Sequence, residues 1–347
     1  MASRSATVRR TTVRGPFGES RPAAIIRLDH ENAVGWGEAS PLESYSPDTL
    51  DDAERDLRNW AQRWEGGADD PGSTDLAPAA VCALDTALLD LASRQRSEAL
   101  HVRLAEILKP LRAVGSVPVC ALVALPGVDR PGVGSVAEDV MAETGRRVAE
   151  GFLAVKFKVG SGAAFQDQLG LLSRVRESFP DLQIRLDANG AWSEEEARHH
   201  LADLAESVRP DLVEQPVGTT ELLTFRAERV AIAADESLRL QDSFPALAAP
   251  GACRAVVLKP MILGGLRACA SMAAEAHARG IQAIVSHTFG GRISHAATCE
   301  LALAVAAAAP TGDITAAGLE GHEGVAQMAG PRIVPADVPG HGAEGES

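Results

Sequence analysis

Short apolar runs alternate with longer amphipathic segments over most of the chain, and this alternation constrains the fold more than any other feature. The segments between the runs have helical length and spacing, so they predict helices. Seven or eight strand-then-helix units in about 200 residues predict a parallel β/α barrel. An open doubly wound sheet is the alternative, but no G-x-G-x-x-G follows the first strand. The predicted strands are 117–123, 153–159, 182–188, 211–216, 230–236, 253–260, 281–287 and, more weakly, 312–318, and the helices are 135–150, 163–179, 193–208, 264–279 and 292–308.

The first third of the chain has a different order, with strands first and helices after them. Residues 5–40 predict two or three strands, and helical periodicity covers 47–66 and 78–112. Ser46 is the predicted N-cap of the first helix, with Pro47 at its first position. An α+β unit therefore precedes the barrel.

Composition excludes several classes of partner. The formal charge is −14 and there is no basic stripe, which disfavours nucleic acid and an anionic membrane surface. The five cysteines are scattered and never form C-x-x-C, so neither a disulfide framework nor a zinc site is indicated. No apolar run approaches 18 residues and no charged-then-apolar leader is present, which predicts a soluble, cytoplasmic protein.

Polar residues stand at the ends of successive predicted strands. Residues i and i+2 of a strand point to the same face, and the C-terminal strand ends of a barrel meet at one mouth. Three carboxylates from three consecutive strands should therefore lie between lysines that arrive from either side. The residues at these strand ends are Lys156, Lys158, Asp187, Asn189, Glu214, Asp235, Glu236 and Lys259.

Three neighbouring carboxylates repel one another and need a cation if all are to stay ionised. Oxygen ligands on a rigid frame favour Mg²⁺, with Mn²⁺ as a substitute. We predict Asp187, Glu214 and Asp235 as the metal ligands, with Glu236 as the fallback for Asp235. A divalent ion beside a small anionic carboxylate substrate would stabilise the enediolate that forms when its α-proton is removed.

The use of lysine is also informative. The chain contains four lysines against 29 arginines, and three of the four stand at strand ends. A buried lysine can lose its proton and act as a base, whereas arginine stays protonated in proteins. The lysines at 156, 158 and 259 therefore predict acid–base chemistry at the barrel mouth.

Two other features have more than one interpretation. His287 and His295 are predicted to be polar pocket or helix-face residues rather than metal ligands, because neither belongs to a ligand-spaced pair. The glycine pairs 264–265 and 290–291 are either tight turns or places where backbone N–H groups approach a carboxylate.

In their joint order, "KFK", "LDANGAW", "VEQP", "ADES" and "LKP" resemble the enolase superfamily, and the K-x-K resembles its muconate-lactonizing-enzyme subgroup. The resemblance implies an α+β capping domain over residues 1–112, completed by about 320–347. It also implies a modified (β/α)7β barrel over 113–319. The metal ligands it implies are the same three carboxylates. Lys158 would be the acid/base of the K-x-K, with Lys259 facing it.

Members of this subgroup catalyse several reactions. Cap residues 35–50, "GWGEASPLESYSPDTL", resemble the corresponding stretch of o-succinylbenzoate synthases. That implies Mg²⁺-dependent dehydration of 2-succinyl-6-hydroxy-2,4-cyclohexadiene-1-carboxylate in menaquinone biosynthesis. Dipeptide epimerases carry an Asp-x-Asp at the eighth strand, and this chain has Asp313 followed by Thr315. A dipeptide epimerase, an N-acylamino acid racemase or a muconate cycloisomerase is the alternative.

The resemblance also suggests substrate contacts. Cap residues 39–49 should close over the barrel mouth, with Leu42 and Tyr45 as apolar contacts. Ser286 and the amide of Gly290 would bind a succinyl carboxylate. Lys156 and Asn189 would contact substrate from the strand ends. The oligomeric state is left open, and a homo-oligomer is compatible with the sequence.

Overall fold

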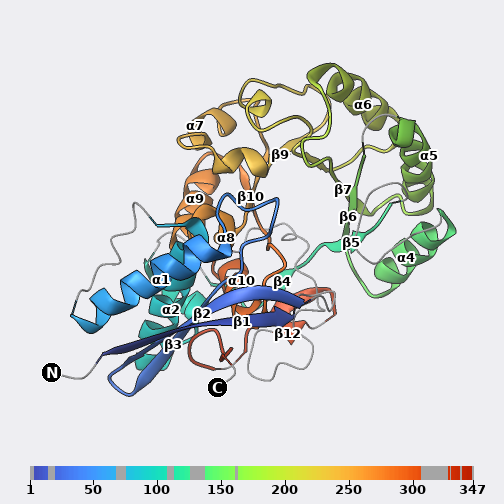
Figure 1. The fold of residues 1–347 in the computed structure, drawn as a ribbon. Coiled ribbons are helices and arrows are strands. Elements are labelled where there is room, and N and C mark those ends of the chain that lie inside the picture. The colour runs from blue at the N-terminus through green and yellow to red at the C-terminus, as the bar shows by residue number, and fades with distance from the viewer. Residues whose placement is uncertain are drawn as a thin grey trace.

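The computed structural model describes residues 4–14, 20–67, 76–107, 113–125, 137–160, 163–305, 327–328, 330–336 and 338–345. The chain forms a small antiparallel sheet with its own helices and a larger curled parallel sheet surrounded by helices (Figure 1). No helix in these residues is both long enough and apolar enough to span a bilayer.

The N-terminal sheet has the order β1-β2-β3 and is antiparallel throughout. Helix α2 packs so closely on β3 that side chains are excluded from two positions of that strand. A Cβ on Gly35 would lie 2.1 Å from the Ala87 carbonyl oxygen, and one on Gly37 would lie 1.9 Å from that of Ala83. The "GWGEA" run thus seats the helix on the sheet. The elements are β1 (Ser5–Arg14), β2 (Ser20–His30), β3 (Ala33–Ala39), α1 (Leu50–Glu65), α2 (Pro78–Gln95) and α3 (Leu100–Ile107).

Two helix predictions in this region are wrong in detail. Helix α1 begins at Leu50 with Thr49 as its N-cap, because the Ser46 hydroxyl instead accepts the Leu42 amide at 2.8 Å within the preceding loop. The single helix predicted over 78–112 is divided into α2 and α3, since the chain turns at Ser97, whose φ is +55°. A left-handed residue cannot continue a right-handed helix.

The larger sheet contains seven described strands in the order β11-β10-β9-β8-β7-β6-β5, each pairing parallel with the next. Six of the predicted strands are confirmed. The predicted strand 117–123 is divided, because only Ala121–Val123 joins this sheet while Val117–Pro118 pairs antiparallel with residues 332–333. The predicted eighth strand, 312–318, lies outside the described residues. The strands are β5 (Ala121–Val123), β6 (Ala154–Lys158), β7 (Gln183–Asp187), β8 (Leu212–Glu214), β9 (Ile232–Ala234), β10 (Ala255–Leu258) and β11 (Gln282–Val285).

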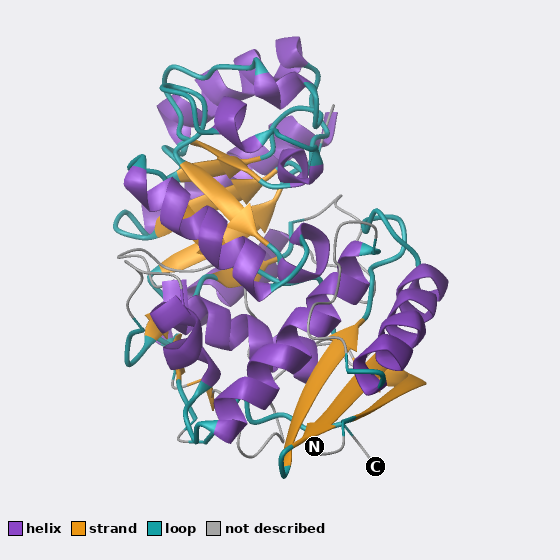
Figure 2. Cartoon of the chain, turned by 90° about the vertical axis from the view of Figure 1, so that its left-hand side faces the viewer, coloured by secondary structure: helices purple, strands orange, loops and turns teal. Residues whose placement is uncertain are grey.

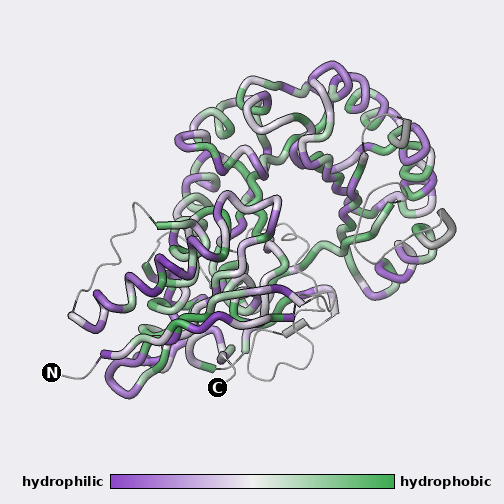
Figure 3. Tube along the Cα trace, viewed as in Figure 1, coloured by the Kyte–Doolittle hydropathy of each residue, from purple (hydrophilic) through white to green (hydrophobic). Residues whose placement is uncertain are grey.

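Helices follow the strands and cover the outside of the curled sheet (Figure 1). Hydrophilic residues recur on the outward turns of these helices (Figure 3), while the strands between them are buried on both faces. Burial on both faces explains why the strands read as continuous apolar runs. The following elements are α4 (Ala137–Ala149), α5 (Ala163–Ser178), α6 (Glu194–Ser207), α7 (Phe244–Leu247), α8 (Pro260–Leu263), α9 (Leu266–Ala278) and α10 (Arg292–Val305), with 3-10 turns η2 (Glu221–Leu223) and η3 (Glu236–Arg239).

Helices lie between the two sheets (Figure 2), and polar contacts cross this joint. Asp85 of α2 accepts from Arg267 of α9 at 2.5 Å, and the His101 ring of α3 lies 2.7 Å from the Glu300 carboxylate of α10. The C-terminal stretch returns to the first unit, where Gly340 bridges Ala99. These contacts support the proposed cap, 1–112 completed by C-terminal residues. A small third sheet joins β4 (Val117–Pro118), β13 (Arg332–Val334) and β12 (Gln327–Met328).

Candidate active site

The register of the parallel strands places the predicted polar residues at equivalent positions along the C-terminal edge of the sheet. Lys158 pairs with Asp187 across β6 and β7, and Asp187 pairs with Glu214 across β7 and β8. Glu214 in turn pairs with Ala233, two residues before Asp235. Three consecutive strands therefore end in charged residues at the same rim of the sheet.

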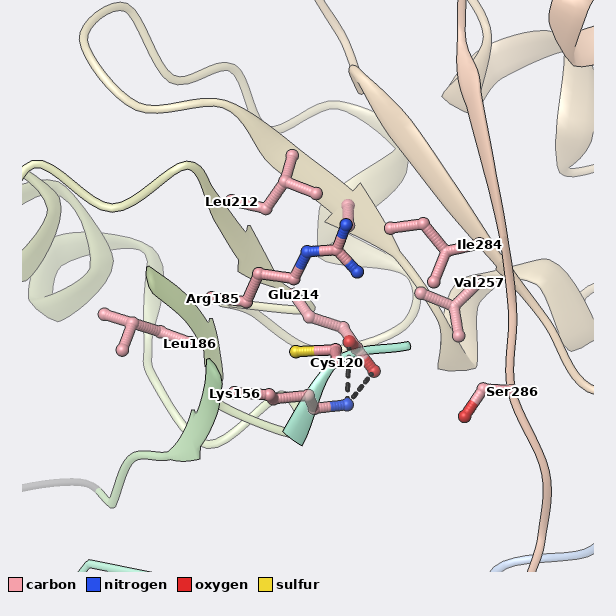
Figure 4. A pocket seen from close by; sticks show the side chains of 10 residues that line it. Cys120, Lys156, Arg185, Leu186, Leu212, Glu214, Val257, Ile284 and Ser286 are labelled. Atoms are coloured by element: carbon pink, nitrogen blue, oxygen red, sulfur yellow. Dashed lines mark hydrogen bonds and ion pairs between the residues drawn. The ribbon is translucent and has the colours of Figure 1, made fainter. Parts of the chain in front are cut away.

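Lys156 binds two of the predicted metal ligands at once. Its Nζ lies 2.9 Å from Oδ2 of Asp187 and 3.0 and 2.9 Å from the two carboxylate oxygens of Glu214. Figure 4 shows the Lys156 ammonium of β6 directed at the Glu214 carboxylate of β8, two strands away in the sheet. Lys156 is only 5% exposed. The two carboxylates thus share one buried positive charge.

Lys259 binds the third predicted ligand, Asp235, from the neighbouring strand end, because β10 pairs with β9. Its Nζ forms an ion pair with Asp235 and donates to the Tyr45 hydroxyl at 2.8 Å. That hydroxyl in turn donates to Asp235 at 3.0 Å, and the ammonium lies 4.8 Å from the Tyr45 ring centroid. A cap residue therefore completes the surroundings of a barrel lysine.

Lys158 has a different environment. Its Nζ donates to the side-chain oxygen of Asn189 at 2.9 Å, at a half-buried position. Asn189 is held in turn by Glu236, whose Oε1 accepts its amide at 3.1 Å. Lys158 and Lys259 therefore reach the site from separate strands and in unlike surroundings.

Burial and neighbouring charges shift the pKa values of Asp187 and Glu214 in opposite directions. Burial alone would raise the pKa of Asp187, but Lys156, Lys158 and Lys259 outweigh it and hold that pKa below the ordinary value. Burial, reinforced by the Asp187 charge, raises the pKa of Glu214 well above its ordinary value, although Lys156 opposes the rise. The positive charge near Glu214 therefore does not offset the burial of its carboxylate.

The surrounding groups show the same imbalance. Burial and then the Asp235 charge raise the pKa of Glu236 and of the Tyr45 phenol. Burial would lower the pKa of Lys259, but Asp235 first and Tyr45 next raise it well above its ordinary value.

The residues fit a divalent cation by their chemistry. In the described residues no group of three His, Cys, Asp or Glu side chains stands ready to hold a metal. Lysine ammonium groups bind Asp187 and Asp235 instead. The donors nevertheless are all carboxylate oxygens, the set that Mg²⁺ prefers. Oε2 of Glu236 is also buried without a hydrogen-bond partner among the described residues. Coordination by Asp187, Glu214 and Asp235 remains a prediction.

A cavity of about 340 Å³ opens above the strand ends, between the cap loop and the barrel. Leu42 and Tyr45 contribute its cap side, while Lys156, Lys158 and Lys259 contribute its floor. Its remaining lining residues are Ser44, Asp187, Asn189, Glu236, Arg239, Ser286, His287, Thr288 and Phe289.

Most predicted contact residues thus line one cavity, but Gly290 does not. A Cβ on Gly290 would meet the side chains of Ser294 and Ser40, so this residue lies at the joint with the cap. The Gly291 amide is also engaged, because it donates to Glu38 at 2.6 Å. The glycine pair at 290–291 therefore serves the joint between cap and barrel.

Sequence reasoning missed part of the cavity wall. Arg239 is the second residue after "ADES". Its guanidinium donates to the Tyr45 carbonyl at 2.5 Å and lies over the Tyr45 ring at 4.9 Å. Thr288 and Phe289 follow His287 in the seventh-strand loop. The position of that loop after a barrel strand was the available signal, since such loops build the mouth.

Beneath the carboxylates lies a narrower space inside the sheet. Arg185 lies two residues before Asp187 on β7, so it shares the inner face with that carboxylate. Arg185 lines this space together with Glu214, Lys156 and Cys120 (Figure 4). A second buried cation therefore underlies the acidic layer.

Known proteins resemble this chain over most of its length. Residues 139–346 match the family described as enolase C-terminal domain-like, and residues 9–91 match MenC, N-terminal domain. The o-succinylbenzoate synthase of Klebsiella pneumoniae is 32% identical over 272 residues, covering 77% of this chain and 74% of that protein.

Solved structures agree on the fold. A dipeptide epimerase from Enterococcus faecalis superimposes with a TM-score of 0.82 at 24% identity, covering 99% of both chains. A dipeptide epimerase from Methylococcus capsulatus, complexed with Mg ion, gives 0.80 at 27% identity and also covers 99% of both.

Proposed function

The chain belongs to the enolase superfamily, and we propose that it is an o-succinylbenzoate synthase that dehydrates 2-succinyl-6-hydroxy-2,4-cyclohexadiene-1-carboxylate. The unequal surroundings of the two lysines carry this proposal. Lys259 is fixed as a cation by Asp235 and Tyr45, whereas Lys158 meets the amide of Asn189 at the cavity floor. A dehydration with one acid/base needs this asymmetry.

In the proposed reaction Lys158 removes the proton α to the ring carboxylate. The electron pair moves into the carboxylate and gives the enediolate of the substrate. The protonated Lys158 then donates to the departing hydroxyl, and water leaves from the same face. Lys259 keeps its charge throughout and lies against the ring as a cation–π partner.

Mg²⁺, when bound, would supply the positive charge that stabilises the enediolate. Asp187, Glu214 and Asp235 would hold it, and the Mg ion in the Methylococcus capsulatus neighbour supports this choice. Lys156 would then remain as the cation between Asp187 and Glu214. Its role is to balance the charge beneath the substrate carboxylate.

The cap would exclude water from the reaction. Leu42 and Tyr45 form the side of the cavity that faces the lysines. Excluding water strengthens every electrostatic interaction with the enediolate. Ser286, buried at the far wall, is the proposed partner of the succinyl carboxylate.

A proton-transfer isomerase is the second candidate. The 27% identity to the dipeptide epimerase of Methylococcus capsulatus favours it, and racemase or cycloisomerase activity would use the same groups. Two-base chemistry requires both lysines to exchange protons with substrate from opposite faces. The ion pair of Lys259 with Asp235 and Tyr45 counts against that requirement.

The test is turnover by purified protein with Mg²⁺ and the cyclohexadiene substrate. We expect loss of the diene absorbance and formation of o-succinylbenzoate, both absent in Lys158→Ala. Lys259→Arg should keep measurable dehydration, since only its charge is needed, whereas a two-base epimerase would lose all activity. No dehydration, together with rapid epimerisation of dipeptides, would replace the proposal with the second candidate.

A further inference from the structure

We propose that Arg21, a cap residue outside the cavity lining, is a positioning residue that fixes the Thr288–Phe289 wall of the active-site cavity and so determines how tightly substrate is held. This inference rests on the proposed function for its kinetic part only. Its structural part concerns the loop itself and can be measured without substrate.

One guanidinium joins two segments that are far apart in sequence. From the start of β2, Arg21 donates to the Thr288 carbonyl at 2.7 Å and to the Phe289 carbonyl in the loop between β11 and α10. It also donates to the carbonyls of Ser40 and Pro41, each at 3.2 Å, where the cap loop leaves β3. A planar fork of five N–H donors suits four carbonyls, and a lysine ammonium does not have this geometry.

The loop that Arg21 holds has an unfavourable backbone. Phe289 has a φ of +56°, a left-handed conformation that bulky side chains rarely adopt. Such conformations persist only where the surrounding structure enforces them, and they concentrate at binding sites. Two hydrogen bonds hold Phe289 in this conformation. Arg21 donates to the Phe289 carbonyl, and the Phe289 amide donates to Nδ1 of His287 at 3.3 Å.

This loop forms part of the active-site cavity wall. Thr288 and Phe289 both line the cavity with the lysines. The Thr288 hydroxyl is buried and has no hydrogen-bond partner among the described residues. A buried hydroxyl without a partner costs free energy, which a polar group of the substrate would recover.

A second attachment makes the role of Arg21 local. Glu38 of β3 accepts from the Ser40 hydroxyl at 2.7 Å, from the Gly291 amide at 2.6 Å and from the Ser294 amide at 3.2 Å. The loop would therefore stay attached at its α10 end after Arg21 is lost. Only the Thr288–Phe289 portion would be released, so the expected defect is in binding rather than in folding.

The kinetic test compares three variants. Arg21→Met should raise KM about tenfold while kcat stays within about threefold, because Lys158 is held by Asn189 and Lys259 by Asp235 and Tyr45. Arg21→Lys should recover little, since it lacks the fork. Arg267→Met is the matched control: it removes another arginine across the cap–barrel joint, the partner of Asp85, away from the cavity. The control should leave KM unchanged.

A double-mutant cycle tests the link to the backbone. Glycine adopts positive φ without penalty, so in a Phe289→Gly background the loop needs less enforcement. The factor by which Arg21→Met raises KM should then be at least threefold smaller in the Phe289→Gly background than in the wild-type background. Equal effects in both backgrounds would overturn the proposal, as would an equal KM increase in Arg267→Met.

Hydrogen exchange gives the readout that needs no substrate. Amides in peptides spanning 284–292 should exchange faster in Arg21→Met and at the wild-type rate in Arg267→Met. Faster exchange without dehydration by the wild type would uphold the positioning role and reject the proposed reaction alone. Unchanged exchange would reject the positioning role whatever the reaction.

Discussion

Lysine and arginine carry the same charge at neutral pH, and they differ most where a proton must be transferred. Among the described residues Lys158 donates a hydrogen bond to Asn189, and its position is half-buried. Replacing it should therefore leave the fold intact. Lys158→Arg keeps the charge but removes the base.

We expect Lys158→Arg to lower kcat by a factor of about 10² or more, in the range that general acid–base catalysis contributes. Circular dichroism and Tm should match the wild type. Steady-state kinetics with the cyclohexadiene substrate provide the measurement. A variant that kept a tenth of kcat, a loss of only about 1.4 kcal/mol, would contradict a general-base role.

Tyr45 tests the contribution of the cap at the same scale. Its hydroxyl joins Lys259 and Asp235, and its ring lies near the Lys259 ammonium. Tyr45→Phe keeps the ring but removes both hydrogen bonds of the hydroxyl. At about 0.5 kcal/mol for each bond it should lower kcat/KM about fivefold, or about 1 kcal/mol. Tyr45→Ala, which also loses the ring, should be worse in the same assay. Equal values for both would mean that the hydroxyl alone matters.

Among the elements, helix α6 supports the loop that follows the K-x-K strand. His200 of α6 stacks on Phe165 with ring centroids 3.6 Å apart, and its edge meets Trp192 at 4.9 Å. The Trp192 indole in turn donates to the Gly160 carbonyl at 3.0 Å, two residues after Lys158. An aromatic cluster under the helix therefore braces the catalytic strand.

This cluster predicts a pH dependence of stability. Burial lowers the pKa of His200 from 6.5, although Glu196 and Asp203 oppose the shift. Above pH 6.5 the imidazole is neutral in both the folded and unfolded states. As the pH falls below 6.5 the unfolded chain gains a proton that the folded chain resists, so stability is lost.

We therefore expect the wild-type Tm to fall more between pH 7.5 and 5.5 than that of His200→Leu, as measured by calorimetry. His199→Leu is the control, because His199 is adjacent to His200 on the same helix but its side chain is exposed. The control should follow the wild type. Parallel pH profiles for His200→Leu and wild type would exclude His200 as the cause.

For the whole molecule, the central expectation is that the metal stabilises the folded state. The carboxylates of Asp187 and Glu214 share Lys156, and burial raises the pKa of Glu214. Mg²⁺ should relieve this imbalance and bind the folded chain alone. At 100 times its Kd it should add about 2.7 kcal/mol to the free energy of unfolding.

Thermal unfolding with and without EDTA measures this effect, with NaCl of equal ionic strength as the control. Asp187→Asn should abolish the Mg²⁺-dependent increase in Tm. An equal increase in that variant would show that the ion binds elsewhere.

Several features of this protein followed from local sequence. Six barrel strands and their helices could be predicted because each has its own periodicity, and their order requires no long-range information. The charged strand ends could be predicted as neighbours because parallel strands in register bring equivalent positions to one rim. The family motifs named the same residues.

Only the tertiary structure determined how those residues pair and what encloses them. Lys156 bridges Asp187 and Glu214, and Tyr45 reaches Lys259 from more than 200 residues away in sequence. The sequence also did not reveal the N-cap at Thr49 or the positive φ of Phe289. Side-chain partners and positive φ angles depend on segments that meet only after folding. The periodicity of a strand or a helix, in contrast, is visible in the spacing of apolar residues within one segment.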